Sequence, residues 1–175
     1  MSRRVSMNAR LNQDAPASSD FEVVLFYITH PSLSTPYRFS TDNADELSVD
    51  PYIRGTRSTW MGSNPATEGF VGILASAVLP DDKDDAPATG QIAIALSDQA
   101  LVTAVRSVTT VPTMHIAVVM ASSPNSVEFE VRDLDIVSAE INGDEILLTF
   151  SRENIELEPC PAGRFTKDSF PGLHK

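Results

Sequence analysis

The stretch from Pro159 to Leu173 constrains the fold of this chain more than any other segment. It holds three prolines, two glycines and two phenylalanines. Proline and glycine at this density prevent a helix or a central strand. Phenylalanines near the end of a chain must be covered, because exposed apolar surface favours aggregation. We therefore expect an extended C-terminal arm over residues 159–175 that lies in a groove, on its own domain or on a neighbouring subunit.

The size of the chain fits one domain with a real core, since it has 175 residues of which 42% are hydrophobic. No apolar run approaches the roughly 20 residues that span a bilayer, so we expect no membrane span. Residues 1–12 lack the apolar block of a secretory signal, which favours cytoplasmic synthesis. The single cysteine excludes an intrachain disulfide and a cysteine-based zinc cage.

The net charge of −11 is concentrated near the C-terminal end of the chain. Between Ser126 and Glu158 there are ten acidic residues against two arginines. Such a surface repels phosphates, so we expect no sequence-specific binding of nucleic acid. Two interpretations stay open: a solvated face that keeps the protein soluble, or an acidic wall past which DNA moves without sticking.

The apolar pattern predicts a mainly β protein. Runs dense in β-branched and aromatic residues, or in alternating apolar residues, are typical of strands. They occur at residues 21–29, 37–40, 52–58, 70–79, 91–96, 114–120 and 127–131. Residues 91–96 alternate bulky and small apolar side chains, as in a strand buried on both faces.

Two helices are expected among these strands. Ser97 is a suitable N-cap, and the apolar side chains of Leu101, Ala104, Val105 and Val108 follow at helical spacing. A flanking helix over about residues 97–108 is therefore predicted. Val5 to Leu11 could form a second, short helix, which would be marginal alone because nucleation is costly.

The region after residue 126 predicts a bulge and a hairpin. Val127, Phe129 and Val131 alternate with polar residues, but the apolar phase changes at Leu134. A bulge at Arg132–Asp133 explains this change. Asn142-Gly143 favours a two-residue turn, which would place Ala139 opposite Ile146 and Val137 opposite Leu148 on a buried face.

The residues with reactive side chains do not form a recognisable catalytic, cofactor or metal site. His30, His115 and His174 lack the spacing of metal ligands, and we expect His115 to be a hydrogen-bonded or interface histidine. The acidic loop at residues 80–85 lacks the order of an EF-hand. Cys160 lies between two prolines with no nearby histidine, and no serine elbow occurs. We therefore expect no enzyme, no cofactor and no metal.

Several motifs, in order over roughly residues 20–173, resemble an uncharacterised-domain family of small tail proteins from phages with long non-contractile tails. Lys167 stands where that family often has proline, and residues 41–78 depart from its pattern. The matching segments are Ile28-Thr29-His30-Pro31-Ser32-Leu33, Pro36-Tyr37-Arg38, Leu79-Pro80-Asp81-Asp82, Ala104-Val105-Arg106-Ser107, Met120-Ala121-Ser122-Ser123-Pro124-Asn125-Ser126-Val127-Glu128, Arg164-Phe165-Thr166 and Phe170-Pro171-Gly172-Leu173.

The resemblance implies a structural virion protein of the distal tail, tail tip or baseplate. It also implies a tail-tube-like β-sandwich or barrel with one flanking helix, assembled into a homo-oligomeric ring that joins the tail tube to the hub. The implied partners are further copies of the chain, the tail tube, the tape measure and the hub, and a hexamer is favoured over a trimer. DNA would pass through the lumen of the ring, and the protein would be made in the host cytoplasm.

Three segments follow from this interpretation: an N-terminal arm or short helix (1–19), a β-rich ring domain (20–158) and the C-terminal arm (159–175). The subunit-interface candidates all lie in the arm: Arg164, Phe165, Phe170, Pro171 and Leu173. The alternative is a host-surface or glycan-binding module of the tail tip. In that case Tyr37, Tyr52 and Trp60 would form an aromatic platform, although Trp60 could equally fill the core.

Overall fold

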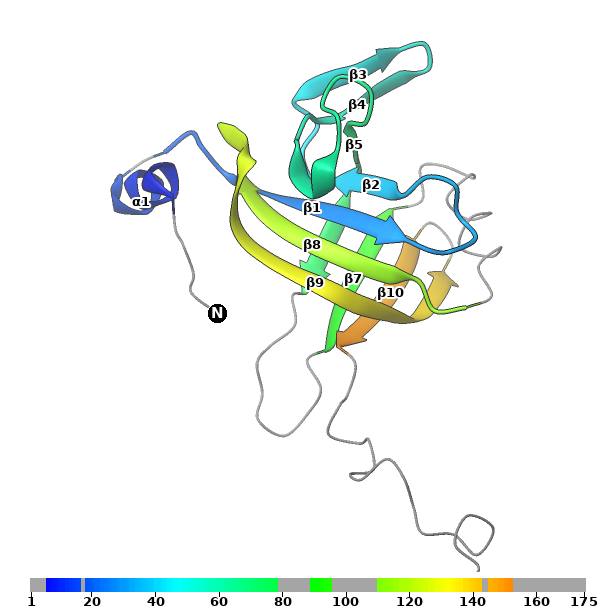
Figure 1. Ribbon diagram of the computed structural model, residues 1–175. Coiled ribbons are helices and arrows are strands. Elements are labelled where there is room, and N and C mark those ends of the chain that lie inside the picture. Colours follow the sequence, from blue (N-terminus) through cyan, green and yellow to red (C-terminus); the bar gives the residue numbers. More distant parts are fainter. Residues whose placement is uncertain (1–5, 17, 79–88, 96–109, 143–144, 153–175) are drawn as a thin grey trace, which may run out of the picture.

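The described part of the chain is mainly β, as the sequence predicts. The computed structural model describes residues 6–16, 18–78, 89–95, 110–142 and 145–152 (Figure 1). Among these residues, no helix has the length and apolar character needed to cross a bilayer. The elements are α1 (Met7–Asp14), β1 (Glu22–Thr29), β2 (Tyr37–Ser40), β3 (Asp45–Val49), β4 (Tyr52–Thr56), the 3₁₀ turn η1 (Trp60–Gly62), β5 (Phe70–Gly72), β6 (Ala75–Val78), β7 (Thr89–Ala95), β8 (Thr113–Met120), β9 (Ser123–Asn142) and β10 (Glu145–Arg152).

All ten strands belong to one sheet, in the order β3-β4-β5-β2-β1-β8-β9-β10-β7-β6. Every neighbouring pair is antiparallel except β2 and β5, which are parallel. The sheet is strongly curled: β1, β8 and β9 cross one side of the molecule, β7 and β10 lie behind them, and the β3–β4 hairpin projects beyond (Figure 1). The order ends at β3 and at β6, so the sheet does not close into a barrel.

The expected sandwich or closed barrel is therefore not confirmed, whereas the mainly β class is. The helix predicted over residues 97–108 and the arm predicted over residues 159–175 lie outside the described residues. The acidic loop of residues 80–85 lies outside them as well.

Strand β8 is the centre of the packing, because every residue from Met114 to Met120 is buried. Its two faces contribute to two different apolar clusters. The main core contains Phe26, Ile116 and Phe150, and the second core contains Val119 and lies on the other face of the sheet. Side chains of a strand alternate between faces, so a strand that is buried on both is largely apolar, and His115 is the polar exception between Met114 and Met120.

The predicted bulge in β9 is confirmed. Met114 pairs with Leu134 and Ile116 pairs with Val131, so β9 has one residue more than β8 between these two pairs. Asp133 has a φ of 58°, the left-handed conformation that a bulged residue often takes. The bulge restores the apolar phase, because Val131 and Leu134 both reach the main core.

A second irregularity in β9 corrects the expected alternation of Val127, Phe129 and Val131. Val118 pairs with Phe129 but Val119 pairs with Val127, so Glu128 is an extra residue. Val127 consequently packs against the second core, whereas Val131 belongs to the main core. Phe129 stays 39% exposed, so the three side chains do not form one buried face.

The expected hairpin register is wrong by two residues. Ile146 pairs with Ile141, and Leu148 pairs with Ala139. Asn142 is the last residue of β9 and pairs with Glu145, the first residue of β10. The two strands are therefore connected by residues 143–144, which lie outside the described residues. Val137 is 65% exposed and does not share a buried face with Leu148.

Two further expectations are adjusted by the structure. Strand β7 is buried on one face only, because Ile92 and Ile94 are buried but Gln91 is exposed. The short N-terminal helix begins and ends later than expected, at Met7 and Asp14. Ser6 is its N-cap, and the backbone N–H of Ser6 donates to Glu128 on β9 at 2.7 Å.

The main core should be sensitive to truncation of Phe150, which is fully buried. We expect Phe150→Ala to lower the free energy of unfolding by about 3–5 kcal/mol, since it removes apolar contacts and leaves a cavity. The control Val137→Ala changes an exposed side chain on β9 and should cost about 0.5 kcal/mol or less. Urea unfolding followed by circular dichroism measures both, and similar losses in the two variants would contradict the core assignment.

Candidate functional site

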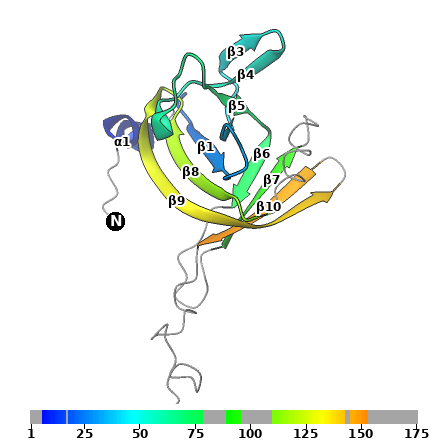
Figure 2. The same cartoon turned by 45° about the vertical axis from the view of Figure 1, so that its right-hand side comes forward.

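A groove of about 810 Å³ lies at the end of the molecule formed by β2, β4 and β5. Its lining also includes Ile73, just after β5, and Ala95, the last residue of β7. The sheet has two halves, β3 to β8 and β10 to β6, with β9 between them in the strand order. Ala95 belongs to the second half and the other lining residues belong to the first half or lie beside it, so the two halves meet here. Figure 2 shows β5, β6 and β7 on this side of the curl, with the β3–β4 hairpin above them. The groove therefore marks the place where the sheet does not close.

The segment Ile73-Leu74, which connects β5 to β6, joins the two halves of the sheet beside the groove. The backbone N–H of Ile73 donates to Ser40 of β2 at 2.8 Å, and the N–H of Ala95 donates to the carbonyl of Leu74 at 2.9 Å. The chain thus pairs with β2 before this segment and with β7 after it. A groove remains because β2 and β7 are bridged by this segment and are not paired with each other.

The floor of the groove is continuous with the main core. Phe39 and Ile73 line the groove and are also buried members of that core. Tyr37 and Val71 line it too and are partly buried against the core. The rings of Tyr37 and Phe39 are stacked, with centroids 6.0 Å apart and planes 7° from parallel. The groove thus exposes the open end of an apolar core.

Close packing of β4 on β5 shapes one wall of the groove. Gly55 pairs with Val71 in this antiparallel contact. A Cβ on Gly55 would lie 1.9 Å from the carbonyl oxygen of Phe70, so no other residue fits without moving the backbone. This close approach fixes the position of Ile53 and Arg54, which are the two residues before Gly55 on β4 and which line the groove.

Exposed apolar side chains occur on the lining of the groove and on residues next to it, and the lining includes two arginines. Val49 and Tyr52, which are opposite each other in the β3–β4 hairpin, are 75% and 63% exposed, and Leu74 is 76% exposed. The charged residues of the lining are Arg38 and Arg54, and no carboxylate lines the groove. This is a local exception in a chain with a net charge of −11.

Arg38 is anchored outside the groove, on the opposite face of β2. Its guanidinium donates to Ser63 at 3.1 Å and to Glu68 at 2.9 Å, and lies 5.5 Å from the centroid of the Tyr27 ring. The backbone N–H of Asn64 and then the charge of Arg38 hold the pKa of Glu68 below its ordinary value. These contacts hold the loop between β4 and β5 against the second core. Arg54, by contrast, is exposed.

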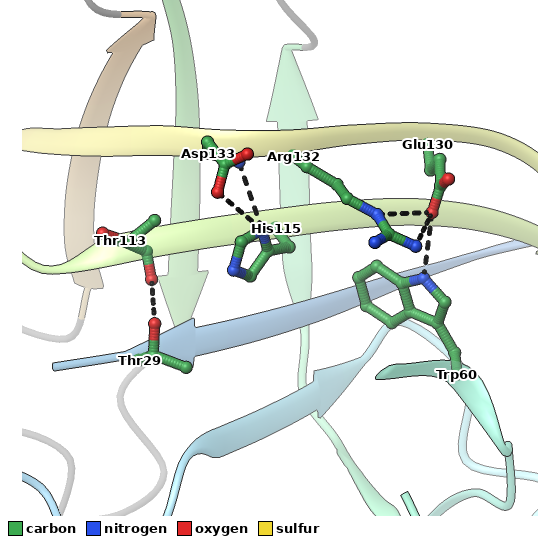
Figure 3. Close-up of polar contacts among 7 residues, drawn as sticks. All are labelled: Thr29, Trp60, Thr113, His115, Glu130, Arg132 and Asp133. Atoms are coloured by element: carbon green, nitrogen blue, oxygen red, sulfur yellow. Dashed lines mark hydrogen bonds and ion pairs between the residues drawn. The ribbon is translucent and has the colours of Figure 1, made fainter. Parts of the chain in front are cut away.

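A row of polar side chains crosses β8 and β9 on that same face (Figure 3). The backbone N–H of Asp133 donates to Nδ1 of His115 at 3.1 Å. Arg132 donates to Glu130 at 3.0 Å, and Trp60 Nε1 donates to the same carboxylate at 3.4 Å. The row connects the β9 bulge to the loop that carries Trp60.

His115 is neutral in this setting. Burial lowers its pKa below the ordinary value, and the charge of Asp133 opposes this effect less strongly. The Asp133 carboxylate is 3.9 Å from Nδ1 but 85% exposed, so water screens it. Because Nδ1 accepts a hydrogen bond, the ring proton is on Nε2. The expectation of a hydrogen-bonded histidine is confirmed.

Other residues singled out in the sequence have structural roles. His30 is buried, and its ring nitrogens contact the hydroxyls of Ser32 and Thr110. Trp60 is only 6% exposed and packs on Tyr27 and Phe70 in the second core. An aromatic platform containing Trp60 is therefore wrong, because its ring covers the sheet and does not face solvent.

Tyr37 and Tyr52, the other two aromatic residues of that expected platform, do come together as lining residues of the groove. The sequence did not indicate the remaining lining residues, such as Ile53, Arg54 and Val71. Their only local signal was a Gly- and Pro-punctuated region between short apolar runs.

The predicted interface residues Arg164, Phe165, Phe170, Pro171 and Leu173 lie outside the described residues. In the described part of the chain, no group of three or more metal-ligating side chains comes together. The acidic side chains Glu140 and Glu145, at the end of the β9–β10 hairpin, are exposed.

Comparison with known proteins adds no assignment: no protein-family model matches the chain, and no curated protein sequence matches it.

The lowered pKa of His115 predicts a pH-dependent stability. An unfolded histidine has a pKa of about 6.5, so the unfolded chain binds more protons in mild acid than the folded one. The contribution of His115 is therefore complete above about pH 6.5 and is lost as the pH falls below that value. We expect the free energy of unfolding to decrease between about pH 7.5 and about pH 5.

His115→Asn keeps an acceptor for the Asp133 N–H but does not titrate, so it should remove this part of the decrease. Asp20 and Glu68, whose pKa values are also lowered, titrate below this window in both proteins. Urea unfolding at the two pH values provides the measurement. An identical pH dependence in the variant and the wild type would contradict the prediction.

Proposed function

We propose that this chain is a structural subunit of a phage tail tip or baseplate, which forms a ring between the tail tube and the hub. Its chemistry is association with further copies and with tail proteins, and not catalytic turnover. The observation that carries this proposal is the open end of the sheet, where the lining of an apolar groove includes the exposed side chain of Tyr52. Val49, opposite Tyr52 in the β3–β4 hairpin, and Leu74, next to the lining residue Ile73, are exposed as well. Exposed apolar side chains beside a groove are typical of protein–protein contacts.

The architecture that we propose for the assembled protein is tail-tube-like. In this proposal the curled sheet is the β-sandwich or barrel of the ring domain, residues 97–108 form its flanking helix and residues 159–175 form the arm. The sheet order, with β3 and β6 at its ends, supports subunits that complete one another. A sixfold ring is favoured over a threefold one, and a heterologous contact between subunits would close it.

The acidic surface supports a ring through which DNA passes. Glu140 and Glu145 are exposed at the end of the β9–β10 hairpin. Carboxylates that face a lumen repel the phosphate backbone, so DNA would pass without binding. The virion is the location that this role requires, with the tape measure, tail tube and hub as neighbours.

A host-surface or glycan-binding module is the second candidate. Tyr37 and Tyr52 in the groove favour it, since aromatic faces commonly bind sugars and other apolar surfaces. The burial of Trp60 weakens it, because the platform loses its largest ring. Binding of the purified chain to a glycan array, with no ring formation, would support this candidate over the first.

The ring proposal predicts that the purified full-length chain assembles, whereas a variant that lacks residues 159–175 stays a folded monomer. The physical reason is that the phenylalanines of the arm supply interface anchors. Native mass spectrometry and negative-stain microscopy measure assembly, and circular dichroism measures folding. A full-length chain that stays monomeric at all concentrations would refute the proposal, and so would a virion tail without this subunit.

A further inference from the structure

We infer that the groove at the open end of the sheet binds the C-terminal segment, residues 153–175, of a second copy of this chain. This inference rests on the proposed function, because it names the contact by which the ring would be built. Phe165 and Phe170 are the anchors, and the stacked rings of Tyr37 and Phe39 are the surface on which the segment lies.

The shape and chemistry of the groove suit this segment. Proline fixes an extended backbone and has no N–H to satisfy, and such chains bind in grooves lined by aromatic rings. The segment carries Pro159, Pro161 and Pro171, and the groove offers Tyr37 and Tyr52. Burial of two phenylalanine side chains would cover the open end of the main core.

The charges are complementary as well. Arg54 is the charged lining residue that is exposed at the groove, because the guanidinium of Arg38 is bound to Glu68 on the opposite face of β2, and no carboxylate lines the groove. Three carboxylates, Glu153, Glu156 and Glu158, precede the prolines of the segment.

The positions of the groove and of the segment favour a head-to-tail contact between copies. Ala95 lines the groove and pairs with Glu145, the first residue of β10. The segment follows Arg152 at the other end of β10, which lies away from the β3–β4 hairpin (Figures 1 and 2). A contact between opposite ends of identical subunits is heterologous, and such contacts build rings or filaments.

The segment is long enough to reach a neighbouring subunit. Phe165 comes thirteen residues after Arg152 (165 − 152), which corresponds to roughly 45 Å of extended chain. A domain of this size has a radius of gyration of about 15 Å. The anchors can therefore extend past the edge of their own subunit.

Cross-linking from the single cysteine, Cys160, tests which segment occupies the groove and whether it belongs to the same chain or to a second copy. Cys160 of the full-length chain is labelled with a maleimide photo-cross-linker, and ¹⁵N-labelled and unlabelled chains are assembled as an equal mixture. We expect cross-links between chains of different label that fall on residues 36–54 or 69–73. Cross-links confined within one chain, or outside these residues, overturn the inference. The latter result is expected if the chain's own residues 97–108 fill the groove.

A charge reversal at the rim tests the groove itself. Tyr52→Glu with Arg54→Glu should raise the dissociation constant between subunits by about 30-fold or more, the effect expected for a lost interface anchor. The control is Val137→Glu with Arg10→Glu, which makes the same change in formal charge at exposed positions of β9 and α1. It should leave the dissociation constant within about threefold, because surface substitutions away from a contact cost little. Analytical ultracentrifugation measures both.

Complementation separates failure of this inference from failure of the proposed function. A chain with Phe165→Ala and Phe170→Ala keeps its groove, and the chain with Tyr52→Glu and Arg54→Glu keeps its segment. Each should be monomeric alone, and an equal mixture should give a one-to-one dimer. If the wild-type chain forms rings and the chain with Tyr52→Glu and Arg54→Glu still assembles as well, this inference alone is overturned. A wild-type chain that never assembles overturns both.

Discussion

Strand β9 is shared by the two halves of the sheet, and the fold depends on the bulge that makes this possible. Its first part pairs with β8, and the part after Asp133 pairs with β10. Without the extra residue at the bulge, Leu134 would turn to the face opposite Val131, because side chains alternate along a strand. The left-handed backbone of Asp133 therefore keeps one apolar core continuous across the bulge.

The strand next to it, β8, divides the interior into two cores. The main core lies inside the curl, and the second core lies on the outer face of β1 and β8 under the loop that carries Trp60. Polar contacts hold this loop at several points: Arg38 binds Glu68, Trp60 Nε1 donates to Glu130, and Ser58 donates to the carbonyl of Pro124. Apolar burial stabilises the loop, and the polar contacts fix its position. The aromatic ring of Trp60 is thus structural, and the groove lies elsewhere.

The groove follows from the same geometry. A sheet that curls without closing must leave its apolar interior open at one end, and here Phe39 and Ile73 lie at that opening. Tyr52, another lining residue, is 63% exposed. Apolar surface exposed to water is costly, and this is why we propose the groove as a site for association. The proposed ring and the proposed docking of the C-terminal segment both use this one surface.

The sequence by itself determined most of the strands and the bulge at Arg132–Asp133, because apolar alternation and its change of phase are local properties of the chain. It did not indicate β3, whose residues Asp45–Val49 are mostly polar, or the division of residues 70–79 into β5 and β6. Only the tertiary structure decided the hairpin register, the burial of Trp60 and the groove. The groove depends on the parallel pairing of β2 with β5, which are about thirty residues apart, and on the position of Ala95 beside them. Pairings of this kind are chosen by how the whole sheet buries its apolar surface, and no short stretch of sequence contains that information.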